Sequence, residues 1–312
     1  MTGPSGAGAP RVALLPTDSR QWLADAITAG GGRRVDVDEA DVLVWTDPDA
    51  PEALSTVLAE HPDIRWVQLP WAGVEPYVAT IRAHPERTWT CAKGAYAEPV
   101  AELALTLLLA GFRGLGTYAR TASWGPPLGH NLTGTRVVVA GGGGIAESLL
   151  RLLAPFECQV TVVRRRPQPM LGAATVVGLD DLDAALDGAD ALVLALALTA
   201  ETDGLVGRRR LGLLADHAWL VNVARGRHVV TDDLVEALRD GRLGGAGLDV
   251  TEPEPLPAGH PLWSMSNVLI TPHVGDTPEM AVPLLSARVG DNLRRWADGR
   301  PLVGAVDPAG GY

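Results

Sequence analysis

Short apolar runs alternate with longer amphipathic segments along the first hundred residues. Four runs rich in Val, Leu and Trp have the length and composition of buried strands: 12–15, 42–45, 66–69 and 89–91. Three segments between these runs have the residue pattern of helices: 21–29, 51–60 and 75–82. This alternation predicts a parallel sheet that helices cover on both faces.

A second series of the same kind follows a long helical segment rich in Ala and Leu at 97–120, in which Pro99 is tolerated in the first turn. A final helix is predicted near 279–297. The predicted strands of the second series are 137–140, 160–163, 191–195, 219–223, 245–250 and 268–270. Since 312 residues suffice for two hydrophobic cores, the expected fold class is α/β with two doubly wound parallel sheets in two domains.

Composition and charge narrow the class of protein. The net charge of −11 argues against a nucleic-acid partner, which calls for a basic surface. Cys91 and Cys158 are the only cysteines, which indicates neither a disulfide framework nor a metal site and suits the cytoplasm. The first ten residues lack the pattern of a signal peptide, and the longest apolar runs are too short to span a bilayer. We therefore expect a cytoplasmic protein with no metal and no membrane association.

A glycine cluster follows the predicted strand at 137–140. Residues 141–146 fit the pattern G-x-G-x-x-A, in which Gly141 makes the tight turn and Gly143 allows close approach of a pyrophosphate. Gly144 and Ile145 then lead into a helix whose N-terminal amides would face the phosphates. The interpretation is a dinucleotide-binding loop, and the alternative is a glycine-rich loop without a ligand.

The end of the next predicted strand determines which dinucleotide is expected. A carboxylate at this point accepts hydrogen bonds from the ribose of NAD, but the chain has Arg164 followed by Arg165. An arginine pairs well with a 2′-phosphate, so the sequence predicts NADP(H) as the preferred cofactor and NAD(H) as the alternative. An identical run of three arginines at 208–210 does not lie at the strand end that meets the ribose. A solvated basic loop is therefore the alternative interpretation of 164–166.

Three residues at successive strand ends suit the reduction of a 2-keto acid. Arg225, Glu254 and His273 each follow an apolar strand, and parallel strands bring their carboxyl ends to one edge of the sheet. Arginine can clamp a carboxylate through two hydrogen bonds, and a carboxylate can orient a histidine that exchanges protons near neutral pH. Taken singly, each residue has a plainer alternative as a surface, loop or structural residue.

The residues around these three resemble the D-isomer-specific 2-hydroxyacid dehydrogenase family, and within it most closely the bacterial glyoxylate/hydroxypyruvate reductases. The resemblance covers nearly the whole chain. The segments that carry it are 71–75, 99–103, the glycine cluster at 141–144, 222–226, 249–257, 272–277 and the closing Gly311-Tyr312.

This resemblance implies a discontinuous substrate domain, flavodoxin-like and formed by residues 1–97 and 284–312, around a Rossmann cofactor domain at 98–283. It implies that His273 is the proton donor, that Glu254 is its partner and that Arg225 binds the substrate carboxylate and keto oxygen. It also implies a homodimer formed through the cofactor domains.

Further binding residues are implied in both domains. Ala224 and Asp249 would contact the cofactor, Asp249 by orienting the nicotinamide carboxamide, with a turn cap as the alternative for Asp249. Backbone amides of Ala72 and Gly73 would bind the substrate carboxylate. Trp45 and Trp71 would line the substrate pocket, with a place in the core as the alternative.

The function expected on these grounds is hydride transfer between NADP(H) and a small 2-keto or 2-hydroxy acid. One alternative is a nicotinamide-dinucleotide-binding protein-interaction module of the corepressor kind. Another is a dehydrogenase for a larger 2-hydroxy acid. The related formate dehydrogenases have a glutamine in place of the glutamate, and Glu254 argues against that activity.

Overall fold

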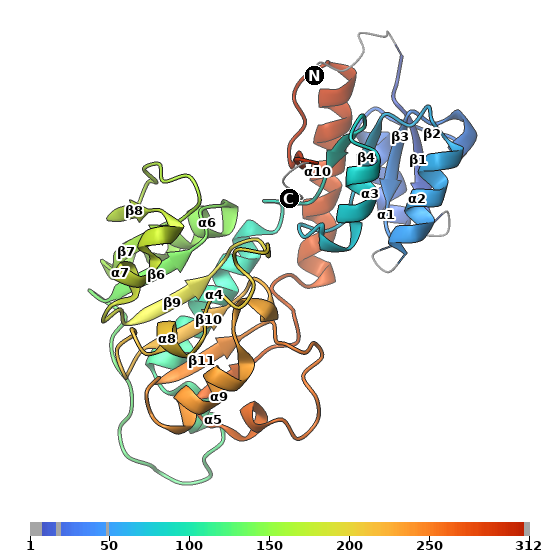
Figure 1. The fold of residues 1–312 in the computed structure, drawn as a ribbon. Helices are drawn as coiled ribbons and strands as arrows, with labels where there is room; N and C mark the ends of the chain where they lie inside the picture. The colour runs from blue at the N-terminus through green and yellow to red at the C-terminus, as the bar shows by residue number, and fades with distance from the viewer. Residues whose placement is uncertain (1–7, 17–19, 48–49, 309–312) are drawn as a thin grey trace. The chain divides into compact units, whose positions relative to one another are not determined.

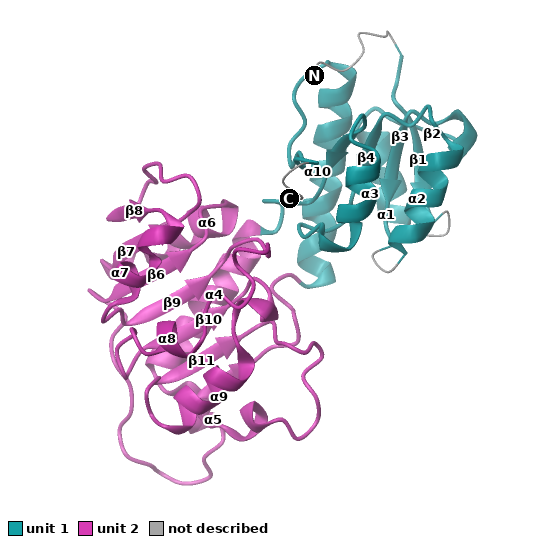
Figure 2. Ribbon diagram, in the orientation of Figure 1, with its two compact units in different colours: residues 1–96, 277–312 teal, residues 97–276 magenta. Residues whose placement is uncertain are grey.

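The computed structural model describes residues 8–16, 20–47 and 50–308, so the closing Gly311-Tyr312 lies outside the described residues. The chain divides into two compact units (Figures 1 and 2). Unit 1 combines Met1–Tyr96 with Thr277–Tyr312, and unit 2 is the continuous segment Ala97–Asp276.

Unit 1 contains a five-stranded parallel sheet in the order β2-β1-β3-β4-β5. This is the strand order of flavodoxin-like folds. All residues of β3 and β4 are buried, as expected of strands that helices cover on both faces. The strands are β1 (Arg11–Leu15), β2 (Arg33–Arg34), β3 (Val42–Trp45), β4 (Trp66–Gln68) and β5 (Thr88–Thr90). The helices are α1 (Gln21–Ala29), α2 (Pro51–Glu60), α3 (Val78–Ala83) and α10 (Pro278–Ala297), with 3-10 turns η1 (Val37–Glu39) and η2 (Glu75–Tyr77).

Unit 2 contains a seven-stranded parallel sheet in the order β12-β11-β10-β9-β6-β7-β8. The order reverses between β6 and β9, and such a switch point is where open α/β sheets bind their ligands. The strands are β6 (Arg136–Ala140), β7 (Gln159–Val163), β8 (Thr175–Val177), β9 (Ala191–Leu194), β10 (Trp219–Asn222), β11 (Gly245–Leu248) and β12 (Val268–Ile270). The helices are α4 (Ala97–Phe112), α5 (Leu115–Ala119), α6 (Gly144–Leu153), α7 (Leu182–Leu186), α8 (Arg208–Leu211) and α9 (Thr231–Arg239). Four further 3-10 turns are η3 (Ala154–Phe156), η4 (Leu179–Asp181), η5 (Gly226–His228) and η6 (Pro261–Ser264).

The predicted fold class is confirmed, and the differences from the sequence prediction are local. The single helix expected at 97–120 is interrupted after Phe112, because Gly114 adopts a left-handed conformation with φ 62° before α5 begins. Strands β2 and β8 were not predicted, since both are short edge strands and neither contains a fully buried residue. Across the described residues, no helix is both long and apolar enough to cross a membrane.

Candidate active site

The segments that carry Arg225, Glu254 and His273 follow three adjacent strands of unit 2. Strand β11 pairs in parallel with β10 on one side and with β12 on the other. Arg225 follows β10, Glu254 follows β11 and His273 follows β12. Because the carboxyl ends of parallel strands share one edge, the structure brings these three segments to the same side of the sheet.

The imidazole of His273 is paired directly with the carboxylate of Glu254. Nδ1 of His273 lies 2.6 Å from Oε1 of Glu254. Both side chains are about half exposed, at 48% and 41%, and an ion pair of that exposure contributes only about 0–1 kcal/mol to stability. Within the described part of the chain, Nε2 has no hydrogen-bond partner. The carboxylate therefore fixes the ring through Nδ1 and leaves Nε2 as the nitrogen that can meet a ligand.

A buried carboxylate holds the loop on which His273 lies. Oδ1 of Asp249 accepts hydrogen bonds from Oγ1 of Thr271 (2.6 Å) and from the amide of Val274 (2.9 Å). Oδ2 accepts from the amide of Gly275 at 3.0 Å, and the amide of His273 donates to the backbone oxygen of Asp249 at 2.8 Å. His273 itself has φ 53°, a left-handed conformation that costs a non-glycine residue roughly 1–2 kcal/mol. The hydrogen bonds to Asp249 stabilise this unfavourable conformation.

The contacts of Asp249 correspond to the turn-capping alternative considered for it. The side chain is 3% exposed, and both of its oxygens are engaged by the loop. Its contact with a nicotinamide carboxamide stays a prediction.

The loop that carries Arg225 is shaped by two neighbours. The side-chain amide of Asn222 donates to the backbone oxygen of Arg225 (2.8 Å), and its oxygen accepts from the amide of Ala224 (3.0 Å). A Cβ atom at Gly226 would lie 1.9 Å from the backbone oxygen of Thr251, so only glycine permits this approach. The close approach holds the Arg225 segment against the segment that leads to Glu254.

Two polar residues near the site were not singled out from the sequence. His228 is fully buried, and its ring nitrogens lie 2.9 Å and 3.2 Å from the backbone oxygens of Thr202 and Leu196. Burial raises the pKa of Asp276, the positive charge of His273 opposes this rise, and the charge of Asp249 adds to it. No sequence pattern marks His228, whereas Asp276 could have been noticed as an acidic residue three positions after His273.

Two glycines of the cofactor loop have different physical reasons to be glycine. Gly141 has φ 121°, and a Cβ atom there would lie 2.1 Å from the backbone oxygen of Ala195. Gly143 would place a Cβ atom in open space, with no protein atom within 4 Å. Helix α6 begins at Gly144, and Ile145 lies in its first turn. The loop thus combines a required tight turn with an open face at the N-terminus of a helix.

The two arginine runs have different surroundings. In the second run, hydrogen bonds from Arg209 (2.6 Å) and Arg210 (2.8 Å) hold the pKa of Asp183 down at about 2. Arg208 pairs with Glu236. Arg164 follows β7 directly and is partly buried, and no ion pair to it occurs among the described residues. Ion pairs within unit 2 therefore explain the second run but leave Arg164 without an ionic partner.

The remaining predicted residues lie in unit 1. Trp45, at the end of β3, is 4% exposed, belongs to the core of this unit and donates from its indole N–H to the backbone oxygen of Asp47 (2.6 Å). This burial matches the core alternative for Trp45. Trp71 is 36% exposed, and the guanidinium carbon of Arg20 lies 5.9 Å from the centroid of its ring.

Ala72 and Gly73, also predicted to bind substrate, lie in the turn that follows β4. The backbone oxygen of Ala72 lies 3.5 Å from Sγ of Cys91. Their predicted contact with a substrate carboxylate stays a prediction.

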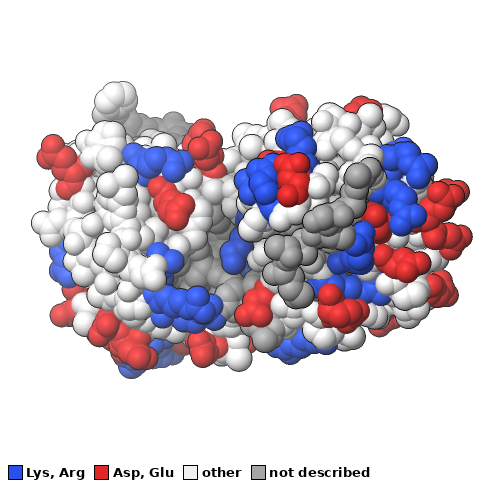
Figure 3. All heavy atoms as spheres, turned by 90° about the horizontal axis from the view of Figure 1, so that it is seen from above, with Lys and Arg blue, Asp and Glu red and all other residues white. Residues whose placement is uncertain are grey.

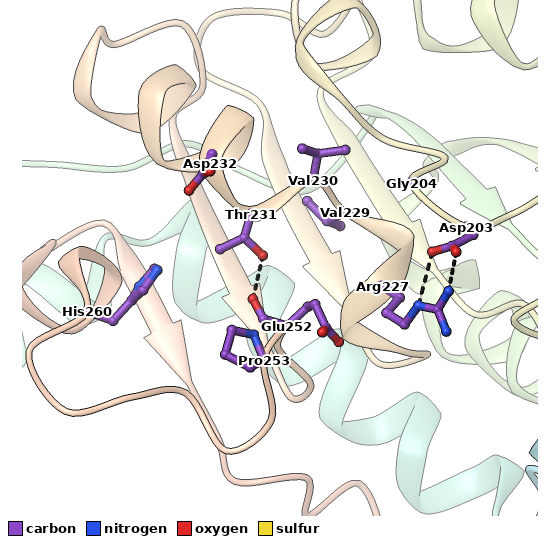
Figure 4. A pocket seen from close by; sticks show the side chains of 10 residues that line it. All are labelled: Asp203, Gly204, Arg227, Val229, Val230, Thr231, Asp232, Glu252, Pro253 and His260. Atoms are coloured by element: carbon purple, nitrogen blue, oxygen red, sulfur yellow. Dashed lines mark hydrogen bonds and ion pairs between the residues drawn. The ribbon is translucent and has the colours of Figure 1, made fainter. Parts of the chain in front are cut away.

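A surface cavity of about 450 Å³ lies in unit 2 and includes none of the predicted site residues (Figure 4). Its lining includes the ion pair of Arg227 with Asp203, and Thr231, whose hydroxyl donates to the backbone oxygen of Glu252 at 2.7 Å. On the face seen in Figure 3, the described acidic and basic side chains are interspersed. Among the described residues, no group of three or more His, Cys, Asp or Glu side chains could hold a metal ion.

A glycine loop at the switch point of a Rossmann-type sheet, together with a paired histidine and carboxylate, defines a dinucleotide-dependent dehydrogenase. The family model described as "D-isomer specific 2-hydroxyacid dehydrogenase, NAD binding domain" matches residues 104–275. The chain belongs to the D-isomer specific 2-hydroxyacid dehydrogenase family, and it is an oxidoreductase of that class, as the sequence predicted.

Similar proteins and structures cover almost the whole chain. A protein named glyoxylate/hydroxypyruvate reductase A from Enterobacter sp. (strain 638) is 30% identical over 311 residues, which span 95% of this chain and 97% of the relative. The structure of a D-isomer specific 2-hydroxyacid dehydrogenase from Xanthobacter autotrophicus Py2, in complex with NADPH and MES, is 30% identical. It has a TM-score of 0.85 and covers 98% of this chain and 100% of its own. The NADPH-dependent glyoxylate/hydroxypyruvate reductase from Sinorhizobium meliloti, in complex with NADP and sulfate, is 25% identical with a TM-score of 0.82, covering 97% and 100%.

Replacing Asp249 by asparagine is expected to loosen the His273 loop. The new amide must present its NH₂ group to at least one backbone N–H, at Val274 or Gly275, and a buried donor left unpaired costs about 1–3 kcal/mol. Urea unfolding of Asp249→Asn should show a loss of that size, accompanied by a lower kcat. The matched control is Asp240→Asn, which removes an exposed carboxylate whose one ion pair among the described residues is with Arg242, and it should change stability by less than about 0.5 kcal/mol. Equal stability of the two variants would contradict the proposed support of the loop.

Proposed function

We propose that this protein reduces small 2-keto acids to 2-hydroxy acids with NADPH, and that NADH is its weaker alternative cofactor. The observation that carries the proposal is the 2.6 Å pairing of His273 with Glu254, at the sheet edge to which the Arg225 segment also leads. Two relatives whose names include glyoxylate/hydroxypyruvate reductase support small keto acids as the substrate class.

The residues of the glycine loop fit a dinucleotide. The space in front of Gly143 is free of protein atoms, and the first amides of α6, at Gly144 and Ile145, are available at its N-terminus for a pyrophosphate. Ala224 and Asp249 would lie towards the nicotinamide end, and Arg164 with Arg165 towards the ribose that carries the 2′-phosphate. When bound, NADPH supplies the hydride. The NADPH complex of the Xanthobacter autotrophicus relative and the NADP complex of the Sinorhizobium meliloti reductase support this assignment.

The proton comes from the protein. His273 donates it from Nε2 to the keto oxygen, because Nδ1 is already engaged by Glu254. The negative charge of Glu254 stabilises the imidazolium before the transfer and keeps the ring oriented. His273 then takes up a new proton from solvent, to which its side chain is about half exposed.

Arg225 binds the carboxylate and the keto oxygen of the substrate. Its position polarises the carbonyl and fixes the face that is reduced. In a chain with a net charge of −11, an anionic substrate depends on such local positive charge. The amides of Ala72 and Gly73 and the ring of Trp71 remain predicted contacts of the substrate, whereas Trp45 belongs to the core of unit 1. The homodimer and the cytoplasmic location remain predictions.

The experiment that tests this function is a panel of glyoxylate, hydroxypyruvate, pyruvate and bulkier 2-keto acids, each with NADPH and NADH, followed at the nicotinamide absorbance. The smaller acids should be reduced fastest.

His273→Ala should lower kcat by about 10²–10⁴-fold while leaving the affinity for NADPH unchanged, since general acid catalysis typically contributes this much. A variant that kept more than about a tenth of the wild-type rate, on that same scale, would rule out His273 as the proton donor.

Arg164 is expected to determine the preference for NADPH. Its charge-assisted hydrogen bond to the 2′-phosphate should favour NADPH by roughly 10- to 150-fold in affinity. Arg164→Asp should erode or reverse the ratio of kcat/KM for NADPH to that for NADH, because a carboxylate repels the phosphate and accepts from free ribose hydroxyls. The control is Arg209→Asp, in the ion-paired second run, which should leave the ratio unchanged. A wild-type ratio that favours NADH would contradict the assignment.

A further inference from the structure

The glycine loop and the end of β7 lie level with each other in the sheet. Strands β6 and β7 pair in parallel with Ala140 opposite Val163. The amide of Gly141 continues this ladder by donating to the backbone oxygen of Val163 at 2.8 Å. Gly142 comes directly after the residue that donates this hydrogen bond, and Arg164 comes directly after the residue that accepts it.

The side chain of Arg164 occupies the space where a side chain at position 142 would be. A Cβ atom at Gly142 would lie 2.7 Å from Cδ and from Nε of Arg164, and 3.0 Å from its Cβ. These three atoms are the nearest neighbours of that Cβ position, and all belong to Arg164. Unlike Gly141, Gly142 does not have a positive φ, so its backbone conformation does not require glycine.

We infer that Gly142 is a specificity-determining residue: its missing side chain lets Arg164 lie against the cofactor loop, where the guanidinium can read a 2′-phosphate. The inference rests on the proposed function, which places the adenosine ribose at this end of the loop. A methyl group at position 142 forces Cδ and Nε of Arg164 to move. Because the Cβ atom of Arg164 is also within 3.0 Å, rotation of the outer side chain alone relieves only part of the clash.

This role separates Gly142 from the next glycine of the loop. Gly143 has no protein atom within 4 Å of its Cβ position, so a methyl group there would project into the space proposed for the pyrophosphate, which NADPH and NADH share. Gly143→Ala should weaken the binding of both cofactors alike. Gly142→Ala should weaken the binding of NADPH selectively.

The test is a double-mutant cycle on the full-length protein, with the dissociation constants of NADPH and NADH measured by titration calorimetry. Gly142→Ala should lower the NADPH preference by roughly tenfold, the lower end of the range for one charge-assisted hydrogen bond. In an Arg164→Ala background, where the contact is already lost, the same change should leave the ratio of the two constants unaltered. Circular dichroism of each variant checks that it is folded, and Gly143→Ala reports the unselective effect of a methyl group in the loop.

The outcomes separate this inference from the proposed function. A wild type that prefers NADPH, with an unchanged ratio in Gly142→Ala, would overturn the role of Gly142 alone. A change of ratio in Gly142→Ala that persists in the Arg164→Ala background would also overturn it, since the effect would not pass through Arg164. A wild type that binds NADH more tightly would overturn both. If the double-mutant cycle gave the expected result but the protein reduced none of the keto acids, the role of Gly142 would be supported and the proposed function contradicted.

Discussion

The arrangement of the candidate site depends on the hydrogen bonds that the carboxylate of Asp249 accepts from the loop after β12. Thr271, Val274 and Gly275 all donate to it, and the loop between them carries His273 in a left-handed conformation. An unfavourable conformation of this kind persists only where the surroundings determine it. Asp249 is nearly inaccessible to solvent, so its unpaired oxygens would be costly if the loop opened. The same bonds therefore set the position of the imidazole and oppose its relaxation.

Other contacts position the remaining groups of the site around the imidazole of His273. Glu254 engages Nδ1, and the segment of Arg225 is held against the neighbouring strand end by the close approach that Gly226 allows. In the cofactor loop, Gly141 makes a tight turn, and Gly142 leaves room for the side chain of Arg164. Gly143 leaves open space in front of the loop. Gly141, Gly142 and Gly226 each lie against a segment that follows a different strand, namely β9, β7 and β11. These contacts bring the loops together at the carboxyl edge of the sheet.

Much of the fold could be predicted from the sequence, because the central strands are short, continuously apolar runs such as 137–140 and 219–222. The edge strand Arg33–Arg34 could not, since two exposed arginines give no apolar pattern. The break after Phe112 could have been predicted from Gly114, which the prediction of one helix at 97–120 did not take into account. The pairing of Glu254 with His273 followed from motif resemblance. Sequence alone offers loop capping as one of two roles for Asp249. It does not give the contact of Gly142 with Arg164, because that contact depends on the register between β6 and β7 and on the rotamer of the arginine.

In the proposed mechanism, the carboxylate of Glu254 fixes the ring of His273 through Nδ1 and leaves Nε2 for the keto oxygen. The most direct measurement compares kcat for keto-acid reduction, and the dissociation constant of NADPH, in the wild type and in Glu254→Gln. Glutamine keeps a hydrogen-bonding group beside Nδ1 but removes the negative charge that makes this hydrogen bond a charge-assisted one. The variant should have a lower kcat and an unchanged affinity for NADPH. A kcat equal to that of the wild type would contradict the role of Glu254.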